Sequence, residues 1–210
     1  MPASRPLFSK MDIFSVQQLQ QEKAKEAVRK LPQQRLNEDE GTLAAEIVNA
    51  LTMEVPVLDE SGIYQSDRQV ELDAKGLRNR IVFNRSRPVP VDATEITIHV
   101  PFKGDPNLFD VRPSQYSGNP PFAEIDGRNA EILLTYRTVD ASFNIRAQYE
   151  KTLQEIKQYL EWLRPAATQV DGLKQTVLAG IAKRKQAAEV HSKVVDSLGL
   201  PKRPPKGIDS

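Results

Sequence analysis

The spacing of apolar residues changes twice along this 210-residue chain, and this change restricts its possible folds more than any other feature. Before residue 53 and after residue 140, apolar residues recur at three- and four-residue steps, the period of an amphipathic helix. Between these parts, short alternating stretches are separated by prolines, which interrupt helices and central strands. The pattern predicts an α+β protein with N-terminal helices, a small, mainly antiparallel sheet and a long C-terminal α-hairpin or coiled-coil arm. The prolines of the middle part are Pro56, Pro88, Pro90, Pro101, Pro106, Pro113, Pro120 and Pro121.

These changes of period predict four segments. We expect an N-terminal helical segment over residues 1–52, a small antiparallel β domain over 53–139, a helical hairpin over 140–198 and a Pro/Lys-rich linker or tail over 199–210. Such a tail has nothing to bury, and it is typical of a disordered end or of a tether to a further domain.

Within these segments, the sequence predicts individual helices and strands. Asp126-Gly127 favours a hairpin turn, and Ile96, Ile98 and Val100 alternate with Glu95, Thr97 and His99 as in a half-buried strand. The expected helices cover residues 12–31, 40–51, 142–170 and 172–197, and the expected strands surround residues 81–83, 95–100, 108–111, 122–126 and 131–137.

A heptad seam follows the predicted sheet. Tyr149, Leu153, Ile156, Leu160 and Leu163 recur at alternating four- and three-residue steps, as in the core of a coiled coil. Pro165 interrupts the pattern and predicts a kink or boundary near Arg164. Two interpretations remain open: the seam packs against the second arm, around Val177 and Ile181, or it pairs with another chain.

Composition excludes several classes of protein. The chain contains no cysteine, which rules out disulfides and thiolate metal sites. No apolar run approaches the roughly 18 residues of a transmembrane helix, and residues 1–14 lack the apolar core of a signal peptide. We therefore expect a cytoplasmic protein with no membrane contact.

The segment Phe102-Lys103-Gly104-Asp105-Pro106 raises the question of a phosphate-binding loop. A Walker loop requires two glycines, a lysine and a following Ser or Thr between a strand and a helix. Here one glycine is present and no hydroxyl residue follows Lys103. Because Gly104 tolerates a positive φ and Asp105-Pro106 favours a turn, the sequence predicts a connection between strands. We expect no cofactor.

Titratable residues give no recognisable catalytic or metal-binding motif. His99 falls on the polar face of a predicted strand and His191 on a basic helix, and neither has a metal-ligand partner at short spacing. Carboxylates in the β region leave a metal-dependent hydrolase as a weaker alternative. The candidates are Asp67, Glu71, Asp73, Asp110, Glu124, Asp126 and Glu131, with Asp73 and Lys75 in the segment ELDAK. We assign no catalytic, cofactor or metal residue.

Basic residues cluster although the net charge is only +1. Arg78, Arg80, Arg85 and Arg87 surround Phe83, which suits phosphate contacts and base stacking. The basic run Lys183, Arg184 and Lys185 lies on the second predicted arm. These residues support nucleic-acid binding as the alternative function, while the competing interpretation is that the arginines pair with the acidic residues of segment 36–62.

Several phrases resemble the N-terminal half of uncharacterised bacterial proteins that carry a downstream restriction-endonuclease-like domain. They are IYQSDRQVELDAKG, RIVFNRSRPVPVDATEITIHVPFKGDPNLFDVRPS, QYLEWL and SLGLP, within residues 60–201. The resemblance implies a non-catalytic half of a nuclease or antiviral defence system, and it transfers no catalytic residues. The leading function is a non-enzymatic interaction, sensor or scaffold module that binds a protein partner or self-associates through its helical arm.

Overall fold

The computed structural model describes residues 4–74, 89–139 and 144–199, which form two compact units. The first unit contains residues 1–17 and 53–168, and the second contains residues 18–52 and 169–210. Each unit is therefore built from two separate stretches of the chain. This division differs from the expected four consecutive segments, because the N-terminal helices share a core with the last helix.

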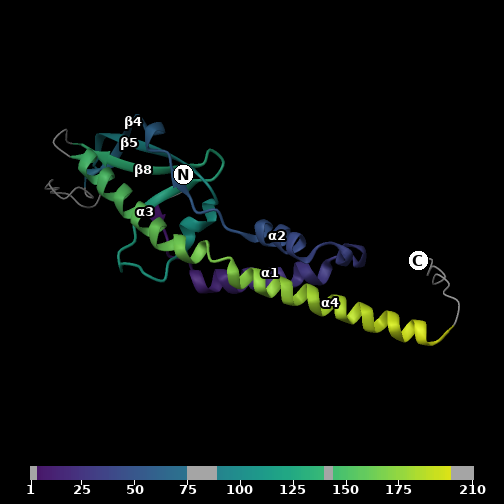
Figure 1. Ribbon diagram of the computed structural model, residues 1–210. Helices are drawn as coiled ribbons and strands as arrows, with labels where there is room; N and C mark the ends of the chain where they lie inside the picture. Colours follow the sequence, from purple (N-terminus) through teal and green to yellow (C-terminus); the bar gives the residue numbers. More distant parts are fainter. Residues whose placement is uncertain (1–3, 75–88, 140–143, 200–210) are drawn as a thin grey trace, which may run out of the picture. The chain divides into compact units, whose positions relative to one another are not determined.

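The described elements confirm the α+β class, with N-terminal helices, an antiparallel sheet and a long C-terminal helical arm (Figure 1). The helices are α1 (Ile13–Lys30), α2 (Glu40–Leu51), α3 (Ile145–Ala167) and α4 (Asp171–Ser197), with short 3₁₀ turns η1 (Gln33–Asn37), η2 (Glu60–Gly62) and η4 (Pro106–Asp110). The strands are β1 (Arg5–Pro6), β2 (Met11–Asp12), β3 (Val57–Leu58), β4 (Tyr64–Asp73), β5 (Pro90–Lys103), β6 (Val111–Arg112), β7 (Phe122–Asp126) and β8 (Glu131–Thr138).

The main sheet has six strands, with β5 between β4 and β8. Both neighbours run antiparallel to β5, and β7 continues the sheet beyond β8 through the predicted hairpin. The Asp126 carboxylate closes that hairpin by accepting hydrogen bonds from the backbone N–H groups of Arg128 and Asn129. Alternation along β5 is as expected: Ile98 and Val100 are buried, and Thr97 and His99 face the other side.

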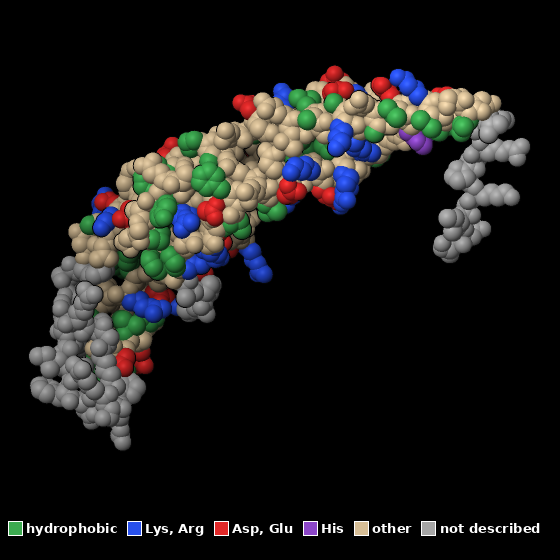
Figure 2. Space-filling view, turned by 90° about the horizontal axis from the view of Figure 1, so that it is seen from below, with side chains coloured by type: hydrophobic (Ala, Val, Ile, Leu, Met, Phe, Trp, Pro, Cys, Tyr) green, Lys and Arg blue, Asp and Glu red, His purple; other side chains and the backbone are tan. Residues whose placement is uncertain are grey.

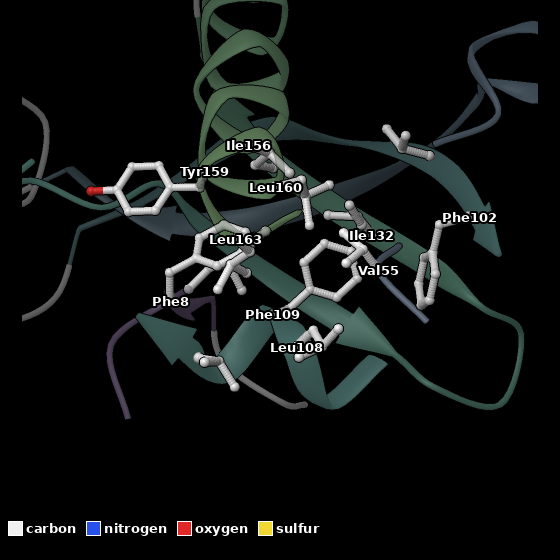
Figure 3. Close-up of a cluster of buried hydrophobic side chains, with 14 of the residues drawn as sticks. Phe8, Val55, Phe102, Leu108, Phe109, Ile132, Ile156, Tyr159, Leu160 and Leu163 are labelled. Atoms are coloured by element: carbon white, nitrogen blue, oxygen red, sulfur yellow. The ribbon is translucent and has the colours of Figure 1, made fainter. Parts of the chain in front are cut away.

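One face of this sheet packs against α3. Ile156, Leu160 and Leu163 point from the helix toward Phe109 and Ile132, as Figure 3 shows. Ile156, Leu163 and Ile132 are completely buried. Since apolar side chains come from the helix, the strands and η4, this cluster is the core of the first unit.

The predicted heptad seam is the buried face of α3, and the sheet of the first unit covers it, which neither of the two open interpretations included. Leu153, Ile156, Leu160 and Leu163 belong to the core with the sheet, and Tyr149 packs at its edge. Val177 and Ile181 belong to the other hydrophobic cluster. A heptad pattern describes only one apolar face of a helix, and a sheet covers such a face as well as a second helix does. α3 continues to Ala167, past Pro165.

The second unit is a small helical assembly. Its core combines Val28 of α1, Leu43 and Ile47 of α2, and Val177 and Ile181 of α4. α4 approaches α1 closely at Gly180, where an added Cβ would lie 3.1 Å from Val28 Cγ1. At the start of α2, the Asp39 side chain accepts a hydrogen bond from the Thr42 N–H and so caps the helix.

The segment around Gly104 is a connection, as predicted. Gly104 has a φ of 110°, and the Asp105 side chain accepts a hydrogen bond from the Asn107 N–H at the start of η4. The expected strand at 108–111 is wrong, because Leu108 and Phe109 lie in η4 and only Val111–Arg112 is extended. The expected strand around residues 81–83 lies outside the described residues.

None of the helices in the described parts of the chain combines the length and apolar composition that crossing a membrane requires.

Candidate functional site

The face of the sheet opposite α3 is polar and is ordered in cross-strand rows. One row contains Arg68, Glu95 and Arg137, from β4, β5 and β8. The next row places the hydroxyl residues Ser66, Thr97 and Thr135 side by side on the same three strands. The third row contains Tyr64, His99 and Leu133, with Glu124 of β7 beyond them. Side chains of one row are neighbours because directly paired residues in an antiparallel sheet lie close together.

Glu95 is the only buried charged side chain among the described residues, with 6% of its side chain exposed. Arg68 Nε donates to Oε1 and Arg137 Nε to Oε2, each over 2.6 Å. The hydrogen bond from Arg137, followed by that from Arg68, lowers the pKa of Glu95 against the opposing effect of burial. The side chains of Arg68 and Arg137 are 47% and 53% exposed, so this row presents two cations around one carboxylate.

A second group connects Ser66, His99 and Glu131. The Ser66 Oγ lies 2.9 Å from His99 Nε2, and His99 Nδ1 lies 3.0 Å from Glu131 Oε2. The Tyr64 hydroxyl donates to the other oxygen of Glu131 over 2.8 Å, and the Tyr64 ring stacks on the imidazole with centroids 4.3 Å apart. The hydrogen bond to Glu131 raises the pKa of Tyr64. The imidazole is therefore held on both ring nitrogens and on one ring face.

The rows line a cavity of about 730 Å³ in the first unit. Such a volume falls within the range of small-molecule sites, although its lining is more polar than that of most such sites. The charged residues of the lining are Arg68 and Arg137, with Asp67 and Glu95 beside them, and Glu124 at the row of His99. The lining residues are Ser4, Ser66, Asp67, Arg68, Glu95, Thr97, His99, Glu124, Leu133, Thr135 and Arg137.

No family model matches this chain, and neither the curated proteins nor the solved structures contain a significant match.

Of the sequence-predicted nucleic-acid residues, only the basic run of α4 is described. Arg78, Arg80, Arg85 and Arg87 lie outside the described residues. Arg184 Nη1 donates to the backbone oxygens of Val28 and Leu31 over 2.6 and 2.7 Å and so caps α1. Lys185 pairs with Glu40 over 3.0 Å, and Lys183 is exposed. Two of these three residues therefore stabilise the second unit.

On the face drawn in Figure 2, acidic side chains lie beside many of the basic ones. Several of the basic side chains in this view lie close to one another, with acidic side chains next to them.

The carboxylates considered for a metal site do not gather. Asp110 pairs with Arg5 and Lys10, Asp126 closes the hairpin, and Glu131 holds His99. Within residues 4–74, 89–139 and 144–199, no group of three or more His, Asp or Glu side chains is close enough to bind one metal ion.

Sequence reasoning placed His99 on the polar face but missed its two partners. Ser66 precedes it by 33 residues and Glu131 follows it by 32, so no short motif joins the three. The register of two strand pairs brings them together. The one signal available was the polar, alternating segment of Tyr64, Ser66 and Arg68, which would fit the polar face of an edge strand.

Proposed function

We propose that this chain is a ligand-binding sensor module, and that the polar face of its sheet is the binding site. The observation that carries the proposal is the row of hydroxyls at Ser66, Thr97 and Thr135, which lies inside the cavity between the arginine row and His99. Hydroxyl groups both donate and accept hydrogen bonds, so a row of them suits a ligand with several polar groups.

The charges of the cavity indicate the chemistry of this ligand. Arg68 and Arg137 supply guanidinium donors at one end of the cavity, and such donors suit an acidic group. Glu124 lies at the other end and favours a donor such as an ammonium or a hydroxyl. We therefore propose a small ligand with a carboxylate or phosphate at one end and hydroxyl or amine groups at the other.

The binding test uses conservative variants of the hydroxyl row. Small acids of three kinds, namely amino acids, sugar phosphates and nucleotides, are screened by thermal shift and then by calorimetry. Thr97→Val and Thr135→Val keep the side-chain shape, and each should weaken binding by about 2- to 10-fold, the value of one neutral hydrogen bond. Lys183→Ala, on the exposed face of α4, is the matched control and should leave the Kd unchanged. Equal affinity in all variants would contradict a site on this face.

Nucleic-acid binding is the alternative function, and its support comes from the arginine-rich segment 78–87 and the exposed Lys183. Titration of a duplex at several salt concentrations separates the two proposals. Phosphate contacts give a steep fall of affinity with salt, and each lost contact lowers the slope by about one unit. Binding of a small acid without any duplex binding favours the sensor.

Contacts with a protein partner would fall on α4, because the seam of α3 is buried in the first unit. Val190, Val194 and Leu198 are 56%, 58% and 64% exposed and recur at four-residue steps. Glu189 and Lys193 flank this stripe with opposite charges, which suits a second copy of α4 in antiparallel orientation. Light scattering at several concentrations tests self-association, and Val194→Glu should return any dimer to monomer.

The biological setting implied by the sequence resemblance, a bacterial nuclease or defence system, belongs to the same proposal. In that setting the module would sense a ligand on the sheet and pass the signal to an effector. Genomic neighbours that encode nucleases would support this setting, and neighbours of unrelated metabolism would count against it.

A further inference from the structure

In the group of Ser66, His99 and Glu131, each hydrogen bond is directed so that a proton can pass from the hydroxyl to the imidazole. Glu131 Oε2 can only accept when the carboxylate is ionised, so His99 Nδ1 carries the proton at that contact. Nε2 is then the acceptor, and the hydroxyl of Ser66 is the donor across 2.9 Å. We propose that Ser66, His99 and Glu131 make Ser66 a nucleophile that accepts acyl groups from activated esters or related acyl compounds.

Two contacts and a difference in exposure distinguish this group from an ordinary polar pair between strands. Tyr64 donates to Glu131 Oε1, so the carboxylate is fixed by two donors. The Tyr64 ring lies on the imidazole with an interplanar angle of 9°, which restricts rotation of His99. Glu131 and His99 have side chains only 13% and 18% exposed, whereas Ser66 is exposed and lines the cavity. The base is thus sheltered and oriented while the nucleophile is accessible, as nucleophilic catalysis requires.

The covalent step balances within these residues and the acyl compound. The Ser66 Oγ attacks the carbonyl carbon, a C–O bond forms, and His99 Nε2 takes the hydroxyl proton. The bond to the leaving group then breaks, and the proton passes from His99 to the leaving group. The products are acyl-Ser66 and the free alcohol or thiol, with no oxidant or reductant.

This inference names a class of ligand for the sensor site, and it rests on the proposed function only in that the acyl group would enter the same cavity. Covalent capture through Ser66 would convert a brief encounter with an acyl compound into a lasting signal. It needs no release of the acyl group by water.

The experiment uses the full chain and a fluorophosphonate probe, which phosphonylates activated serines with loss of fluoride. Intact-mass measurement and peptide mapping after incubation at pH 8 should show one adduct, on Ser66. Ser66→Ala removes only an exposed hydroxyl and should abolish the adduct, and Ser114→Ala, at another exposed serine, should not. His99→Gln should lower the labelling rate at least about 100-fold, the usual contribution of a general base.

Circular dichroism of His99→Gln separates a relay from a structural role. This variant should keep the spectrum of the unmodified chain while its labelling rate falls. No adduct on the chain, when trypsin is labelled in parallel, would overturn the relay. An adduct that persists in Ser66→Ala would overturn it as well.

The two proposals fail independently. The probe reacts through Ser66 alone, whereas ligand affinity is measured with Thr97→Val and Thr135→Val. If the chain binds a small acid but is not labelled, the relay is contradicted and the sensor site is supported. Labelling without any small-acid binding supports the relay and contradicts the proposed acidic ligand.

Discussion

Replacement of Glu95 by glutamine tests the arginine row quantitatively. Glu95→Gln keeps the shape of the side chain and removes the charge that Arg68 and Arg137 share. Loss of one partner from a buried ion pair costs about 3–5 kcal/mol when the other charge stays buried. Here the arginines are about half exposed and can turn to water, so we expect a smaller loss of about 1–3 kcal/mol at pH 7.

Replacement of the two arginines should lower the free energy of unfolding more than Glu95→Gln does. Arg68→Met combined with Arg137→Met leaves the carboxylate of Glu95 buried without its two charged partners, and we expect a loss of at least about 3 kcal/mol. Urea unfolding followed by fluorescence of Trp162, which packs against the core of the first unit, measures both losses. If the double arginine variant loses no more free energy of unfolding than Glu95→Gln, the argument that burial of the Glu95 charge dominates this row is refuted.

The effect of Glu95 should also depend on pH. Because its folded-state pKa is lowered, Glu95 contributes stability that is present above its unfolded pKa and disappears as pH falls through the folded one. The difference in unfolding free energy between the unmodified chain and Glu95→Gln should therefore shrink below about pH 4–5. A difference that stays constant from pH 7 to pH 3 would contradict the lowered pKa.

Three further substitutions test the two cores and the connection. Ile156→Ala should lower the free energy of unfolding by about 2–5 kcal/mol in urea, because the side chain is completely buried; a loss under about 1 kcal/mol would contradict the packing. Arg184→Met should cost about 1–2 kcal/mol in unfolding followed by circular dichroism, since the carbonyl oxygens of Val28 and Leu31 at the end of α1 lose a charged donor. Gly104→Ala should cost about 1–3 kcal/mol by thermal unfolding, because φ is 110° and the new Cβ would lie 2.9 Å from the Glu54 oxygen; an unchanged Tm would refute that strain.

The elements with a strong local pattern were predictable from the sequence. α2 has the expected bounds, since its apolar period and the Asp39 cap are both local signals. The two faces of β5 follow equally directly from its alternation. The sequence analysis did not predict β4. The first six residues of this strand are all exposed, and an edge strand of this kind has almost no apolar pattern.

Features that depend on distant parts of the chain were not predictable. The seam of α3 gave the buried face correctly, but an apolar face does not specify whether a sheet or a helix covers it. The alignment of Ser66, His99 and Glu131 needs the register of β4 and β8 on β5. A shift of one residue would turn every side chain of a strand to the other face, so the candidate site follows from tertiary structure alone.

The interleaved order of the two units has a consequence for synthesis on the ribosome. α2 is complete at Leu51, but its apolar face packs on α4, which begins at Asp171. At about 5–20 residues per second, Leu43 and Ile47 emerge roughly 6–24 s before their partners on α4 exist. In that interval the sheet and α3 of the first unit are synthesised in full, so they can fold first. The nascent chain would therefore expose the unfinished helical unit to chaperones, and a ribosome stalled before residue 171 would leave it permanently incomplete.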